Sequence, residues 1–171
     1  MHNNWLSFTL PDLSREELYK NVQLVNIPFK PMSHSDLHMT MMYFGKIIHD
    51  RTKYNIMVNI MKQIETKKTF KFTFKCYSYF PYTKKNHIVA IYDTTPDCYE
   101  YVKTVRNTLK KAGIVDPDES FIPHVTMGRI IGKSVYDDTH LSHLTPLPDF
   151  EVSTSYMCGE LYKYMDKEFS L

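Results

Sequence analysis

Residues 37–45 read LHMTMMYFG, and residues 121–130 read FIPHVTMGRI. Each stretch is apolar enough to form a strand, and each carries a histidine two residues before a threonine: His38 with Thr40, and His124 with Thr126. Successive side chains of a strand point to opposite faces of a sheet, so residues two apart share a face. Each stretch therefore places an imidazole and a hydroxyl side by side.

The His-x-Thr pattern alone is weak evidence. With 8 histidines and 15 threonines in 171 residues, 8 × 15/171, or about 0.7, matches are expected by chance, and three occur. The third, His143 with Thr145, is followed by two prolines in a loop-like segment, so we interpret it as a chance match. The other two share a methionine after the threonine and lie 124 − 38 = 86 residues apart, about half the chain, as a duplicated unit would.

Around these stretches the sequence predicts irregularly alternating strands and helices. Strands are predicted at residues 5–10, 37–44, 70–80, 87–93, 121–131 and 150–157. Helices are predicted at 52–66 and 95–112, and a short helix is predicted to start near Ser14 and Glu17. Ser14 and Glu17 have the spacing of a capping box, and Pro96 and Gly113 suit the two ends of the third helix. Two sets of side chains alternate along residues 70–80, Phe70, Phe72 and Phe74 with Lys71, Thr73 and Lys75 at its start. This stretch is predicted to form a hairpin with residues 87–93, with one face buried. This order favours an α+β fold with antiparallel sheet over a doubly wound parallel one.

Length, composition and charge restrict the class of protein further. A chain of 171 residues with 43% apolar residues is expected to form one domain over residues 1–171. No apolar run approaches the roughly 20 residues that span a bilayer, so a soluble, intracellular protein is expected. The net charge of +2 is too balanced for holding long nucleic acid by counterion release, which favours a short nucleotide ligand. There is no GxGxxG or GxxxxGK[ST] motif.

Several other residue groups are interpreted as structural. The cysteines lack metal-ligand or disulfide spacing and are expected to be free, buried thiols: Cys76, Cys98 and Cys158. The remaining histidines lack the paired context and are expected on the surface or in loops: His2, His34, His49, His87, His140 and His143. The most basic stretch is expected to be a solvated strand face with its turns: Lys67, Lys68, Lys71, Lys75, Lys84 and Lys85.

The paired histidines suit phosphodiester cleavage. This reaction needs one group to take a proton from the nucleophile and another to protonate the leaving oxygen, and imidazole titrates near neutral pH. Threonine hydroxyls on rigid strands can donate hydrogen bonds to the phosphate oxygens as charge develops on them. Two histidines suffice without a metal, so a chelator is expected to leave the rate unchanged. Aromatic faces for base stacking are offered by Trp5, Tyr43, Tyr162 and Tyr164.

The two stretches resemble the 2H phosphoesterase superfamily, which includes LigT-like 2′,3′-cyclic phosphodiesterases, 2′-5′ oligoadenylate phosphodiesterases and viral enzymes that cleave cyclic-nucleotide messengers. The resemblance covers most of the chain and implies two pseudo-symmetric lobes with antiparallel sheets around a central cleft. It implies that His38 and His124 are the acid–base pair, without assigning either role, and that Thr40 and Thr126 bind phosphate. From related messenger-cleaving enzymes, Trp5, Glu160 and Tyr162 are further candidates for the nucleotide pocket.

The function predicted from these observations is metal-independent cleavage of a short nucleotide, namely a 2′-5′ oligoadenylate or a cyclic dinucleotide such as cGAMP. The resemblance extends this to a viral countermeasure to nucleotide-based immune signalling, acting in the host cytoplasm. Two alternatives stay open. One is an RNA-processing 2′,3′-cyclic phosphodiesterase acting on tRNA or small-RNA ends, and the other is an inactive RNA- or protein-binding module of the same fold. No cofactor and no obligatory protein partner is expected.

Overall fold

The computed structural model describes residues 4–45, 52, 55, 56, 59, 60, 63, 68–81, 84–114 and 120–153, except the side chains of 4, 5, 43–45 and 153. The elements follow in the order β1 (Asn4–Phe8), α1 (Asp12–Leu24), β2 (Phe29–Pro31), the short 3₁₀ helix η1 (His34–Asp36), β3 (Met39–Gly45), β4 (Thr69–Phe80), β5 (His87–Thr94), α3 (Pro96–Lys111), β6 (His124–Ile130), the 3₁₀ helix η2 (Asp138–Leu141) and β7 (Phe150–Ser153). The described residues between 52 and 63 are helical, in agreement with the helix predicted there.

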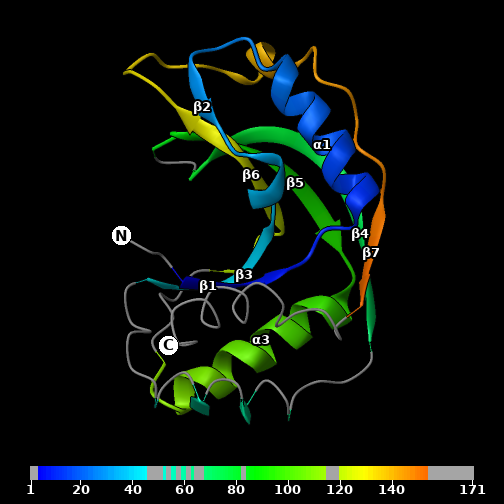
Figure 1. Ribbon diagram of the computed structural model, residues 1–171, viewed down its shortest axis with the longest axis vertical. Helices are drawn as coiled ribbons and strands as arrows, with labels where there is room; N and C mark the ends of the chain where they lie inside the picture. Colours follow the sequence, from blue (N-terminus) through cyan, green and yellow to red (C-terminus); the bar gives the residue numbers. More distant parts are fainter. Residues whose placement is uncertain are drawn as a thin grey trace, which may run out of the picture.

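The described strands form one antiparallel sheet in the order β1-β3-β6-β5-β4-β7, with β2 pairing on β6 (Figure 1). The predicted α+β class with antiparallel pairing is therefore confirmed, including the β4–β5 hairpin. β2 was not predicted, because Pro28 and Pro31 bracket only a few residues. Proline is tolerated there because β2 pairs on one side only.

The sheet has a narrow junction in its middle, where β3 meets β6. Met39 opposite Val125 is the one residue pair that joins these two strands. β1 and β3 lie on one side of the junction above α3, while β2, β5 and β4 extend from β6 on the other side, next to α1 (Figure 1). The two parts correspond to the two expected lobes. Their relative placement depends on few backbone hydrogen bonds at this point.

The two well-described helices begin and end differently from one another. α3 starts at Pro96 after Thr95, and Gly113 takes a positive φ of 82° just beyond its end, as the sequence predicts. The predicted capping box on α1 is wrong: the helix begins at Asp12, and Ser14 is buried inside its first turns. Asp12 favours the earlier start, because an acidic residue in the first turn interacts well with the helix dipole.

One hydrophobic core holds the elements together. Leu18 and Val22 of α1, Val102 and Leu109 of α3, and Met39 of β3 all belong to it and are nearly inaccessible to solvent. From residue 37 to 41 and from residue 124 to 127, buried residues alternate with half-exposed ones, so one face of these stretches is buried and the other is partly exposed. The fold thus leaves one sheet face available at the junction.

A β-bulge interrupts the aromatic alternation of β4. Phe74 lies opposite Tyr92, whereas Cys76 lies opposite Ile91, which leaves Lys75 as the extra residue. An extra residue exchanges the two faces of the strand beyond it. Phe70 and Phe72 are buried before the bulge, whereas Tyr79 is the buried aromatic near the end of the strand and Phe80 is half-exposed on the other face.

Gly128 of β6 is required by the close approach of β2. A Cβ at this position would lie 2.5 Å from the backbone oxygen of Lys30 and 2.5 Å from Cδ2 of Phe29. Because one of these atoms is backbone, a larger residue must push β2 away. We expect Gly128→Ala to lower the free energy of unfolding by about 1–3 kcal/mol, the usual cost of overpacking, and Gly128→Ser to lower it further. Urea denaturation measures both, and an alanine variant as stable as the wild type would contradict the contact.

Candidate functional site

The two His-x-Thr pairs lie next to each other at the junction of the sheet. His38 immediately precedes Met39 of β3, and His124 immediately precedes Val125 of β6. Because Met39 faces Val125 in an antiparallel pair, the flanking positions place Thr40 opposite His124 and His38 opposite Thr126. Met39 and Val125 are fully buried, whereas the four flanking residues are half-exposed. All four therefore belong to the open face, which we call the histidine face.

The two imidazoles are held in the same way. Nδ1 of His38 lies 2.7 Å from the backbone oxygen of Asp36, and Nδ1 of His124 lies 2.7 Å from the backbone oxygen of Ile122. A carbonyl oxygen only accepts, so Nδ1 must carry the proton in both rings. In the neutral imidazole the lone pair is then on Nε2, and in the protonated one Nε2 carries a second proton. Both rings thus present Nε2 as the proton-exchanging atom.

Phe80 is a site residue that the sequence analysis missed. Its ring centroid lies 4.5 Å from that of His124, with 31° between the ring planes. The bulge at Lys75 brings it to the histidine face, because regular alternation from Phe72 would have buried it. The sequence holds no glycine or proline at that position to signal a bulge. Phe80 supplies an apolar wall beside the second imidazole.

A row of basic and aromatic residues continues this face across four strands. Lys30 of β2 pairs with Arg129 of β6, Arg129 with His87 of β5, and His87 with Phe80 of β4. Directly opposed residues in a sheet share a face, so the row lies on the side of Phe80 and His124. In the described part of the chain no carboxylate pairs with Lys30 or Arg129. Within the described part of the chain, the positive charges of Lys30 and Arg129 are therefore not compensated by a carboxylate.

Arg129 and His87 in this row correct or extend the sequence analysis. Strict alternation from His124 and Thr126 would have turned Arg129 to the core side, but Met127 is an extra residue in the pairing of β6 with β5. His87 was expected on the surface or in a loop; instead it lies half-buried in β5. Burial lowers the pKa of His87, and the charge of Arg129 acts in the same direction, while a backbone hydrogen bond at Phe80 opposes them.

The other predicted nucleotide-binding residues are only partly placed. The backbones of Trp5 and Tyr43 pair with each other in β1 and β3, at the edge of the sheet, and their side chains are outside the described part. Glu160, Tyr162 and Tyr164 lie outside the described residues. Their role in nucleotide binding stays a prediction.

The third His-x-Thr match, His143 with Thr145, makes contacts with α1. Nε2 of His143 donates to the backbone oxygen of Leu24, at the end of α1, at 2.7 Å. The backbone nitrogen of Thr145 donates to Oδ1 of the buried Asn21 at 2.9 Å. These contacts fix the segment between η2 and β7 against α1. His143 can therefore serve as a control histidine in functional tests.

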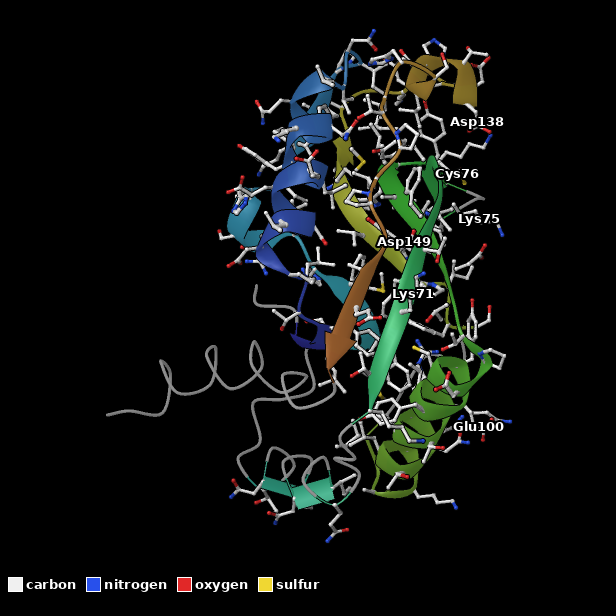
Figure 2. The ribbon with its side chains drawn as sticks, turned by 90° about the vertical axis from the view of Figure 1, so that its right-hand side faces the viewer. Lys71, Lys75, Cys76, Glu100, Asp138 and Asp149 are labelled. Carbon is white, nitrogen blue, oxygen red and sulfur yellow. The ribbon has the colours of Figure 1, made fainter. Side chains whose placement is uncertain are left out.

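The basic stretch and the cysteines have mostly structural surroundings. Lys71 of β4 forms an exposed ion pair at 3.3 Å with Asp149, the residue before β7 (Figure 2). Lys75 forms an exposed ion pair with Asp93 at 3.3 Å. The expectation of a solvated face is confirmed for these lysines. Cys98 is a free buried thiol, as predicted, and burial raises its pKa to about 11. Cys76 is free but exposed, because the bulge beside it turns it away from the core. Outside the described residues lie Cys158, His2, His49 and Lys67.

The described residues contain neither a metal-binding cluster nor a membrane-spanning helix. No group of three or more His, Cys, Asp or Glu side chains is arranged to hold a metal ion in that part of the chain. None of its helices is both long enough and apolar enough to cross a membrane.

Comparison with known proteins identifies the fold. No protein-family model and no curated protein matches the sequence. Among solved structures, E. coli LigT complexed with 3′-AMP superposes with a TM-score of 0.69 at 16% identity, covering 88% of this chain and 84% of its own. A crystal structure of a phosphoesterase matches with a TM-score of 0.67 at 16% identity over 89% and 84%. The protein TT0787 of Thermus thermophilus has a TM-score of 0.67 at 16% identity over 88% and 84%.

These matches show that the chain has the fold of the 2H phosphoesterases. LigT and TT0787 each share this arrangement over most of both chains. The expectation of a LigT-like fold, made from the two His-x-Thr stretches, is thereby confirmed.

Proposed function

We propose that this chain is a metal-independent phosphodiesterase whose reaction takes place on the histidine face. The observation that carries the proposal is the matched pair of imidazoles, each held at Nδ1 by the carbonyl oxygen two residues before it. Rings fixed in this way differ from histidines that merely fill a surface. Both have the same tautomer, and both lie beside a threonine on rigid strands.

The proposed chemistry requires one histidine in each protonation state. Nε2 of the neutral histidine takes the proton of the nucleophile, which is water in hydrolysis or a neighbouring ribose hydroxyl in transesterification. A new P–O bond forms while the bond to the leaving oxygen breaks, and the protonated histidine donates its Nε2 proton to that oxygen. Thr40 and Thr126 donate hydrogen bonds to the non-bridging oxygens. The symmetry of the two halves leaves both assignments of acid and base open.

The proposed substrate is a short nucleotide, specifically a 2′-5′ oligoadenylate or a cyclic dinucleotide such as cGAMP. Support comes from the basic row beside the histidines, which suits phosphate groups, and from the exposed part of the Phe80 ring, which suits a base. E. coli LigT, which shares the fold, has been crystallised with phosphate, 3′-AMP, NADP+ and ATP. A role in evading nucleotide-based immune signalling, in a host cytoplasm, is part of the proposal through the resemblance to viral enzymes.

A substrate panel in EDTA tests this proposal. The wild type and the His38→Ala/His124→Ala double variant are incubated with 2′-5′ oligoadenylate, 2′3′-cGAMP, 3′3′-cGAMP, a nucleoside 2′,3′-cyclic phosphate and a cyclic-phosphate-ended RNA, and products are separated by chromatography. We expect the wild type alone to cleave one of the first three, at the same rate with and without the chelator.

The remaining outcomes separate the alternatives. Turnover of the cyclic-phosphate RNA in preference to the others would replace the proposed substrate by an RNA end. Inhibition by EDTA that added metal reverses would overturn the metal-independent mechanism. Cleavage of none of the substrates would favour a binding module of the same fold.

A further inference from the structure

Arg106 of α3 contacts β3 and the segment that precedes β6, next to the two His-x-Thr pairs. Its Nε and Nη2 donate to the backbone oxygen of Met41 in β3, at 2.9 and 2.7 Å. Its guanidinium carbon lies 5.8 Å from the ring centroid of Phe121, three residues before His124. The side chain is partly buried. One cation therefore contacts β3 just after Thr40 and the segment that leads into His124.

The carbonyl that Arg106 binds belongs to a β-bulge. Leu6 pairs with Met42 and Ser7 pairs with Thr40, so Met41 is an extra residue in the pairing of β3 with β1. The extra residue of a bulge lies outside the regular ladder, and bulges change the direction of neighbouring side chains. Met41 is fully buried, so its carbonyl needs a partner within the protein. Arg106 supplies two N–H groups to it.

The bulge adjoins the candidate phosphate-binding residue. Thr40 immediately precedes Met41, and His38 lies two residues further back on the same face. The direction of both side chains therefore depends on the backbone that Arg106 holds. In the segment before β6, Phe121 is fixed by ring contacts with Phe8 at 6.3 Å and with Tyr99 of α3 at 5.9 Å. Arg106 packs against a ring that is already anchored.

The narrow junction makes such a connection necessary. β3 and β6 share one backbone pair, Met39 with Val125, so the sheet alone defines the spacing of the two imidazoles weakly. The contacts of Arg106 with β3 and with the segment just before β6 add a constraint on the spacing of the two strands. We propose that Arg106 is a positioning residue: it fixes the β3 bulge and, through Phe121, the approach to β6, so that His38 and Thr40 meet His124 and Thr126 in reactive geometry.

The test compares Arg106→Met, Arg106→Lys and a control, Val102→Ala, with the wild type. Val102 is a buried residue one turn earlier in α3, so its truncation destabilises the same helix while the hydrogen bonds from Arg106 to the Met41 carbonyl are kept. Misplacing a reacting group by about 1 Å can cost on the order of 10²-fold in rate. We expect Arg106→Met to lower kcat by 10- to 100-fold with KM within about threefold. Arg106→Lys should recover part of the lost kcat, and Val102→Ala should have the kcat of the wild type. All variants are assayed below their melting temperatures.

An activity-independent measurement keeps this inference separate from the proposed function on which it rests. The imidazole resonances of His38 and His124 are assigned by NMR with the single histidine variants. We expect Arg106→Met to shift the His38 resonances and Val102→Ala to leave them in place. The proposed function fails if the wild type cleaves no phosphodiester. The positioning role fails if Arg106→Met leaves the His38 resonances unchanged, or keeps a kcat equal to that of Val102→Ala.

Discussion

Replacing either His38 or His124 by alanine is expected to reduce kcat by roughly 10²- to 10⁴-fold, the contribution typical of general acid–base catalysis. Each substitution removes the Nε2 that exchanges a proton and leaves the strand intact. Because the two rings act as one unit, the double variant should be little worse than the more impaired single variant. Steady-state kinetics on the best substrate of the panel measures this, with thermal unfolding as the check on folding.

His143→Ala is the matched control for these two variants. His143 also precedes a threonine by two residues, but its Nε2 bonds to the end of α1 rather than facing the junction. We expect its loss to leave kcat unchanged. The pH profile adds a second criterion: the wild type should show a bell-shaped dependence of kcat/KM, and each single variant should lose one limb. Full activity in either His38→Ala or His124→Ala would rule out the paired mechanism.

Replacing Thr40 or Thr126 by valine is the second large effect that we expect. Valine keeps the branched shape and the strand preference of threonine, so packing changes little, but the hydroxyl donor is lost. Removing one preorganised donor to a developing negative charge costs on the order of 10²-fold in kcat. KM should change less, because the hydrogen bond strengthens as charge grows on the phosphate.

Serine variants decide whether the hydroxyl is responsible. Thr40→Ser and Thr126→Ser keep the donor and lose only a methyl group, so they should retain most of the wild-type kcat. If the serine variants were as impaired as the valine variants, keeping the hydroxyl would not preserve kcat, and the loss in the valine variants could not be assigned to the hydroxyl donor alone. If the valine variants were as active as the wild type, the phosphate would have to be bound elsewhere, with Arg129 the next candidate.

The sequence predicted the parts of this fold that depend on local patterns. The apolar runs around His38 and His124, the alternating β4–β5 hairpin, and the proline and glycine at the ends of α3 each carry their own signal. The pairing of β3 with β6 could be expected only through the resemblance. Its register joins residues 86 positions apart, and no local propensity encodes it.

Most errors of the sequence analysis occur where one extra residue in a strand shifts the alternation of its side chains. Phe80, Arg129 and Cys76 reach their faces because of extra residues at Lys75 and Met127. No glycine lies beside Lys75, whereas Gly128 directly follows Met127. On β4, aromatic residues occur at both even and odd positions, so hydrophobicity cannot locate the change of face. The misplaced start of α1 arose because Ser14 and Glu17 match a cap, although Asp12 already suits the first turn.

The bulge at Lys75 also defines where β4 can change its length during evolution. Deletion of this one residue would leave Phe74 opposite Tyr92 and Cys76 opposite Ile91, as in an uninterrupted ladder. Both halves of the strand would keep their core and their solvent-facing residues. A deletion anywhere else in the strand would invert every residue that follows it. Insertions and deletions in homologous chains should therefore concentrate at this position. Homologues with and without the extra residue should both keep the aromatic ring beside His124.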